Sequence, residues 1–235
     1  MGTGEAPDDG TVHELLARLR GERPRAMSTA FRTSGPTASA GDDLYEAFLF
    51  ALVLRAARAE GYEVGLEDGT GRPPAVVRLR RSPGRLYSSQ AFTHAVLTLS
   101  GTAKPPLAVH TGVAVAGKSK VAHEADVVVL QQPAAERCRQ LGTDPQSSKA
   151  VMVVEGKVYR KQPVGLGTGR EFLGLDSDLS TKTTIFAATF TSLSIVHLLQ
   201  GKAMSYSVGV LPGCKGEQEV RELFAQALRG YRNAP

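Results

Sequence analysis

The chain has 235 residues, enough to bury the core of a single domain with appendages. Its 28 basic and 23 acidic residues give a formal charge of +5, which suits a polyanionic partner without requiring one, and its two cysteines exclude a disulfide-rich scaffold. Because the longest apolar run, residues 47–54, is too short to span a bilayer and residues 1–10 lack the features of a signal peptide, we expect a cytoplasmic protein without membrane contacts.

The N-terminal residues are expected to form an arm that is separate from the main domain. Residues 1–10 are polar and contain several glycines, which predicts disorder. Apolar residues recur at helical spacing in residues 11–21, whereas residues 24–41 have the Ser, Thr, Ala and Gly content of a linker. We therefore divide the chain into an arm with a short helix, residues 1–41, and a domain, residues 42–235.

The domain is predicted to begin with a buried helix. Asp43 and Glu46 have the spacing of a capping box ahead of the apolar sequence AFLFALVL. The helix is apolar nearly all round, so it should pack against a sheet. In this interpretation Glu46 caps the first helical turn.

Three segments after this helix are candidate strands. Residues 62–66 form a short apolar run, and residues 91–99 fit either a strand or a helix. Residues 75–81, AVVRLRR, alternate so that Arg78 and Arg80 share one face of a predicted strand. Such a face is commonly just solvated, but its charge also suits contact with nucleic-acid phosphates.

Residues 112–119, GVAVAGKS, match the P-loop pattern GxxxxGK[ST] letter by letter. A working P-loop needs a helix that opens at the Lys-Ser pair, but here another β-prone run follows almost at once. We therefore predict a β-hairpin over residues 107–130 that turns at residues 117–119, and no nucleotide site.

Two valine-rich runs, residues 127–130 and 151–154, read as buried strands with ionisable residues at their ends. Asp126 precedes the first run, and Glu155 and Lys157 follow the second. Glu155 and Lys157 are two residues apart, so their side chains leave the strand by the same face. If the strands are neighbours, two carboxylates and an ammonium meet at one margin of the sheet, where they can hold a divalent cation and a water.

This pattern resembles the PD-(D/E)XK nuclease superfamily, whose restriction-endonuclease-like fold has a mixed central sheet flanked by helices. The matching residues are Ala125-Asp126 and residues 155–157, with Ala125 in place of the motif's proline. The resemblance covers residues 42–211 and rests also on the order of elements, since a hairpin leads into the acidic strand.

The resemblance implies a role for each residue of the motif. Asp126, Glu155 and the carbonyl oxygen of Gly156 would bind Mg²⁺, with Mn²⁺ as a substitute, because oxygen ligands favour these cations over zinc. Lys157 would orient the attacking water and stabilise charge at the phosphate. Many family members carry an acidic residue on the first helix that faces the metal, so Glu46 has this second interpretation beside helix capping.

Further basic residues follow the motif. Arg160 and Lys161 extend the basic character beyond Lys157, and Arg170 lies near a predicted helix start, where it could meet a DNA phosphate. Residues 165–171 are rich in glycine and read either as a flexible loop or as a phosphate cradle before that helix. The remaining elements are expected to be a strand, a helix, a strand and an amphipathic helix at residues 183–190, 191–201, 205–211 and 217–232.

The expected function is that of a magnesium-dependent endonuclease that cuts DNA, with bacterial defence or repair as roles suggested only by family analogy. Two alternatives remain open. One is the same fold acting on RNA, or as an effector subunit that a partner activates. The other is a non-catalytic nucleic-acid-binding or scaffold module that retained the fold. A homodimer or a partner subunit would supply recognition, since no second domain is recognisable.

Overall fold

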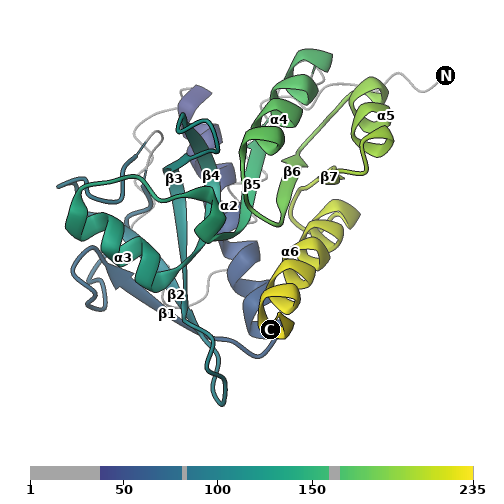
Figure 1. The fold of residues 1–235 in the computed structure, drawn as a ribbon. Helices are drawn as coiled ribbons and strands as arrows, with labels where there is room; N and C mark the ends of the chain where they lie inside the picture. Colours follow the sequence, from purple (N-terminus) through teal and green to yellow (C-terminus); the bar gives the residue numbers. More distant parts are fainter. Residues whose placement is uncertain (1–37, 81–83, 159–164, 235) are drawn as a thin grey trace.

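The computed structural model describes residues 38–80, 84–158 and 165–234. Within these ranges the chain is an α/β domain in which a mixed sheet lies between two layers of helices (Figure 1). The expected α/β class, with a mixed central sheet flanked by helices, is confirmed. The predicted helix over residues 11–21 and the predicted phosphate contacts Arg160 and Lys161 lie outside the described residues.

The sheet has seven strands, and their order in the sheet follows their order in the chain. The first five strands pair antiparallel, whereas β5, β6 and β7 pair parallel. Each parallel step requires a crossover, which a helix provides. The strands are β1 (Glu63–Asp68), β2 (Thr93–Thr98), β3 (Leu107–Ala116), β4 (Ala122–Gln131), β5 (Ala150–Lys157), β6 (Thr184–Ala188) and β7 (Ser205–Val208).

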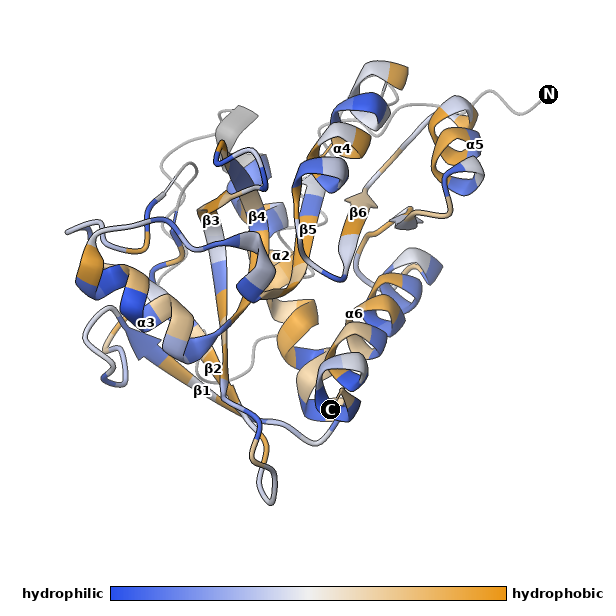
Figure 2. Ribbon diagram, viewed as in Figure 1, coloured by the Kyte–Doolittle hydropathy of each residue, from blue (hydrophilic) through white to orange (hydrophobic). Residues whose placement is uncertain are grey.

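Five helices cover the sheet in the described part of the chain. On one face lie α2 (Ala38–Ala59) and α6 (Lys215–Asn233), which share the largest apolar core with the central strands. On the other face lie α3 (Gln132–Leu141), α4 (Leu166–Asp178) and α5 (Leu193–Gly201), over two smaller cores. Figure 2 shows the apolar residues concentrated on the central strands and on α2. None of these helices combines the length and the apolar composition needed to cross a bilayer.

Helix α2 is buried as predicted, but it does not begin where we expected. It starts at Ala38, so Asp43 and Glu46 lie inside the helix and the predicted capping box is wrong. From Leu44 to Val53 nearly every side chain is buried, because the helix packs against the sheet on one side and α6 on the other. Glu46 is also buried, with 8% of its surface exposed.

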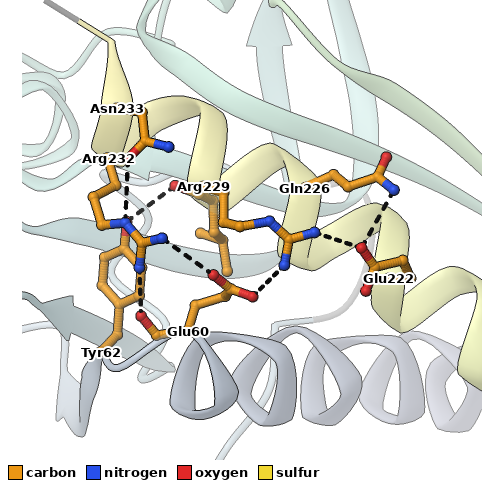
Figure 3. Close-up of polar contacts among 8 residues, drawn as sticks. Glu60, Tyr62, Glu222, Gln226, Arg229, Arg232 and Asn233 are labelled. Atoms are coloured by element: carbon orange, nitrogen blue, oxygen red, sulfur yellow. Dashed lines mark hydrogen bonds and ion pairs between the residues drawn. The ribbon is translucent and has the colours of Figure 1, made fainter.

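Polar contacts fix the end of α2 to α6 (Figure 3). Arg229 Nη1 contacts Glu60 Oε1 at 2.5 Å, and Arg232 Nη1 donates to the Glu60 carbonyl oxygen at 2.9 Å. The Tyr62 hydroxyl donates to the carbonyl oxygen of Leu228 at 3.2 Å. These contacts fix the position of the end of α2 relative to α6.

Two other predictions are wrong. Residues 75–80 are irregular and form no strand; the Arg78 carbonyl oxygen accepts from the Thr93 N–H at 2.7 Å, and Arg80 stacks on Phe92. The glycine-rich stretch is not a loop either, since α4 begins at Leu166. A Cβ at Gly169 would come within 2.9 Å of Leu198, so this glycine allows α5 to pack closely on α4.

The β3–β4 hairpin is confirmed, with Ala116 paired to Ala122 across the turn. The turn residues of the P-loop pattern bind the end of α4 instead of opening a helix. Lys118 Nζ donates to the carbonyl oxygen of Ser177 at 2.8 Å, and the Ser119 N–H donates to Asp178 Oδ1 at 2.8 Å. The segment therefore has a structural role in this fold.

Asp178 should make the hairpin's attachment to α4 sensitive to acid. Hydrogen bonds from Ser119 and His123 lower the pKa of Asp178 from 3.8 to about 2. This stabilisation is present above the unfolded pKa and is lost as the pH falls through about 2. We expect Asp178→Asn to lower Tm at pH 7 and to match the wild type near pH 2. Thermal denaturation between pH 2 and 7 measures this, with Glu171→Gln, exposed on the same helix, as the control.

Candidate functional site

The predicted site lies where β4 and β5 separate. Their pairing ends at Val127 and Val154, as the valine-rich runs predicted. Beyond that point β4 pairs only with β3, while residues 155–157 of β5 pair with β6. Asp126 and Glu155 are the first residues past the last pair, so the two strands diverge at the motif.

A glycine on β3 accompanies this divergence. Gly112 lies opposite Asp126 in the β3–β4 register, and its φ of 55° is in the left-handed region that favours glycine. Residues two apart on a regular strand share a face, yet Val127 packs in the α2 core and Ala125 in the core under α3. The strand is therefore bent at Asp126.

The separated strands and α2 enclose a cavity of about 510 Å³. It brings together all five residues predicted for catalysis and metal binding. Six of the side chains around it are carboxylates and one is an ammonium, so the cavity is strongly acidic. Its lining consists of Asp42, Asp43, Tyr45, Glu46, Glu124, Asp126, Glu155, Gly156, Lys157 and Val158.

Asp126 is a carboxyl of the site whose pKa is raised. Its Oδ2 accepts a hydrogen bond from the Gly156 N–H at 2.6 Å. Burial, and next the charge of Glu155, raise the pKa of Asp126 to about 7, although Lys157 and the Gly156 N–H act in the opposite direction. The carboxyl therefore shares its site with a proton near neutral pH, and a cation would compete with that proton.

Glu155 and Lys157 lie together, as their spacing on the strand predicted. The Lys157 Nζ is 2.5 Å from Glu155 Oε1. Between them, Gly156 provides the contact with α2, because a Cβ there would come within 2.6 Å of Leu49 Cδ1 and 3.3 Å of the Tyr45 ring. The glycine of the motif thus allows the helix that carries Glu46 to reach the site.

Tyr45 is a site residue that the residue pattern did not single out. Only 1% of its surface is exposed, and its hydroxyl has no hydrogen-bond partner among the described residues. Burial, and then the nearby Asp126, raise the pKa of Tyr45 well above its usual value. In the sequence, only its position next to Glu46 could suggest that Tyr45 belongs to the site. That suggestion also requires knowing that this helix faces the site.

The donor set of the cavity fits magnesium or manganese in chemistry. Its carboxylate oxygens and the Gly156 carbonyl are hard ligands of the kind these cations prefer. In the described part of the chain, however, no group of three or more His, Cys, Asp or Glu residues is arranged to hold a metal ion. Lys157 and the Gly156 N–H contact the oxygens of Glu155 and Asp126 instead.

Among the residues predicted to contact nucleic acid, Arg78, Arg80 and Arg170 are described by the structure, and none of the three lines the cavity. Arg78 is exposed on the irregular segment before β2, and Arg170 is exposed on α4. Arg80 is buried, with 9% of its surface exposed. Its guanidinium lies 3.7 Å from the centre of the Phe92 ring and donates to the Arg85 carbonyl oxygen at 2.6 Å, so the solvated basic face expected for Arg80 is wrong.

Comparison of the chain with protein-family models, with characterised proteins and with solved structures found no match. Its function is therefore inferred from the residues and geometry of this site.

The Tyr45 hydroxyl should cost stability, because it has no hydrogen-bond partner among the described residues. We expect Tyr45→Phe to raise the free energy of unfolding by about 1 kcal/mol, because it removes this buried polar group. Tyr62→Phe is the matched control, since it removes a hydroxyl that donates to Leu228, and it should lower the same quantity by about 1 kcal/mol. Urea denaturation in chelator measures both. Destabilisation by Tyr45→Phe would show that its hydroxyl is satisfied in solution.

Proposed function

We propose that the protein is a magnesium-dependent phosphodiesterase that cuts DNA and has the restriction-endonuclease-like fold. The observation that carries this proposal is the convergence of Asp126, Glu155 and Lys157 at the point where β4 and β5 diverge, with Glu46 reaching the same cavity from α2. The order of the elements supports it as well. A buried helix precedes an antiparallel run of strands, and a helix then leads to a parallel strand.

The charge of the cavity supports a role for divalent cations. Without bound cations, six carboxylates and one ammonium would repel a phosphodiester that approached the site. A binding surface for nucleic acid has no need of so many acidic groups, because its affinity comes from basic side chains. A site that first binds cations and then a phosphate does need them, and this favours an enzyme over the non-catalytic module.

Each residue of the motif would have its own role in hydrolysis. Asp126, Glu155 and the Gly156 carbonyl would hold Mg²⁺, with Glu46 directly or through water. The bound cation supplies charge neutralisation at the phosphate and acidifies water. Lys157, no longer paired with Glu155, would orient the attacking water and donate to a phosphate oxygen as negative charge develops there. A donor placed where charge develops lowers the barrier more than it strengthens ground-state binding.

The proposal that the substrate is DNA rests on charge and composition. The net charge of +5 and the exposed Arg78 and Arg170 suit either nucleic acid. The chain has no tryptophan, and its sequence gives little sign of a base-stacking platform for single strands. RNA cleavage and activation by a partner are therefore separate outcomes of the test.

Removal of Lys157 separates catalysis from metal-dependent binding. We expect Lys157→Met to slow single-turnover cleavage by about 10²-fold, as loss of an oxyanion donor does, while affinity for DNA changes little. Asp126→Asn should abolish cleavage through loss of the cation. The control is Lys149→Met, which removes an exposed ammonium just before β5. The substrates are plasmid, linear and single-stranded DNA and RNA, each with magnesium, manganese or chelator.

Equal rates for Lys157→Met and the wild type would show that the proposed active site is wrong. Cleavage of RNA alone would show that the same active site hydrolyses RNA and not DNA. Binding without cleavage under every condition would favour the non-catalytic module, unless a partner protein restores activity.

A further inference from the structure

A second group of polar side chains lies on the other face of the sheet, beneath α3. It consists of Arg80, His94 on β2, His110 on β3 and Arg139 on α3, and we call it the Arg80–Arg139 cluster. This face is distinct from that of α2, because Ala108, two residues before His110, packs with Ala135 of α3. The cluster shares no residue with the acidic cavity.

The two histidines are completely enclosed. His94 is 0% and His110 1% exposed, and their rings stack with centroids 4.7 Å apart and planes 15° apart. Phe92 packs against both rings, at 5.9 and 6.0 Å. Within the described part of the chain, neither nitrogen of either ring has a hydrogen-bond partner. Buried polar groups are rarely left unpaired in this way, so these nitrogens require an explanation.

Arg80 presents an open pair of donors in the same cluster. Phe92 lies under the plane of its guanidinium, and the Arg85 carbonyl oxygen accepts from Nη1. The remaining donors, Nε and Nη2, are buried and have no partner among the described residues. These two atoms form one edge of the guanidinium, whose parallel N–H groups match the two oxygens of a carboxylate or phosphate. Nη1 of Arg139 is also buried and unpaired within the described chain.

No carboxylate in the described part of the chain pairs with Nε or Nη2 of Arg80. The charge of Glu67 interacts with Arg139 and that of Asp68 with His94, but Glu67 Oε2 is 3.7 Å from His94 Nε2, too far for a hydrogen bond. Glu136 of α3 contributes a charge near Glu67, and its own Oε1 accepts from Gln132. Burial and the charge of Arg139 lower the pKa of Arg80 to about 10, as expected for a guanidinium without a close counter-ion.

The charges of the two arginines favour an anion. Burial, followed by the charges of Arg139 and Arg80, lowers the pKa of His94 to about 4, so its ring is neutral at pH 7. The histidines and Glu67 do not form a metal site, because none of the described groups of His, Cys, Asp and Glu has that arrangement. The unpaired atoms of both arginines are donors only, and donors with positive charge call for an anionic acceptor.

We propose that the Arg80–Arg139 cluster binds a small oxyanion of the phosphate class. Two of its oxygens accept from Nε and Nη2 of Arg80, Nη1 of Arg139 donates to it, and the neutral imidazoles donate through their N–H groups. The ligand connects the irregular segment before β2 with β2, β3 and α3. It therefore stabilises the packing of α3 and of residues 75–80 on the sheet, whether or not the acidic cavity is catalytic.

The test is binding to the full chain in low-salt, phosphate-free buffer that contains chelator. Inorganic phosphate and adenosine monophosphate are titrated separately by calorimetry, and Tm is followed with chloride at equal ionic strength as the reference. We expect saturable binding with a matching rise in Tm. Binding of phosphate alone identifies a free ion, whereas equal binding of the mononucleotide identifies a terminal phosphate group as sufficient.

Variants assign the binding to the cluster. Arg139→Gln should weaken phosphate affinity by about 10-fold or more, the effect of losing a hydrogen bond to a charged group. Arg137→Gln removes the same charge from an exposed position of the same helix and should leave affinity unchanged. Arg80→Lys keeps the charge but removes the paired donors, so it should weaken binding as well.

Two results would overturn the proposal. One is the absence of saturable binding of either ligand to the wild type, which needs no variant to fold. The other is equal affinity of Arg139→Gln and Arg137→Gln, since the anion would then lie elsewhere. Neither measurement involves divalent cations or cleavage, so failure here is distinct from failure of the proposed nuclease activity.

Discussion

The hydrogen bond from the Gly156 N–H to the Asp126 carboxylate is the contact on which the site depends. Strands that diverge leave main-chain groups without their ladder partners, and such groups are costly when buried. Here a side-chain oxygen on β4 accepts from the β5 amide at 2.6 Å, just past the last paired residues. The strands can therefore part and open a cavity while the amide remains satisfied. The same carboxylate is placed among other charges, which is why its pKa rises to about 7.

The position of α2 follows from the same place in the sheet. Only a residue without a side chain at 156 allows the helix to lie against β5, and the contacts of Glu60 with α6 hold the helix there. Glu46 and Tyr45 consequently face the motif. The excess of carboxylates and a phenol without a hydrogen-bond partner among the described residues both cost stability, and such local conflicts are typical of functional sites.

Much of the fold and of the candidate site could be predicted from the sequence, because the patterns that indicate them are local. The valine-rich runs fix β4 and β5, the alternation around residues 155–157 fixes which side chains share a face, and the missing helix after Ser119 excludes a P-loop. The failures concern tertiary packing. Arg80 stacks on Phe92 and is buried, Gly169 serves a contact between helices, and α2 starts earlier than its capping signal. None of these contacts leaves a periodic pattern, and the same holds for the unpaired groups of Tyr45 and the Arg80–Arg139 cluster.

The central claim is that Asp126 and Glu155 share a divalent cation. The most direct measurement is anomalous diffraction from crystals of the protein soaked in manganese, recorded near the manganese absorption edge. The account predicts a peak between these two carboxylates, with ligand oxygens about 2.0–2.6 Å away, and the Lys157 ammonium displaced from Glu155. Anomalous density elsewhere on the protein, with none between Asp126 and Glu155, would contradict it.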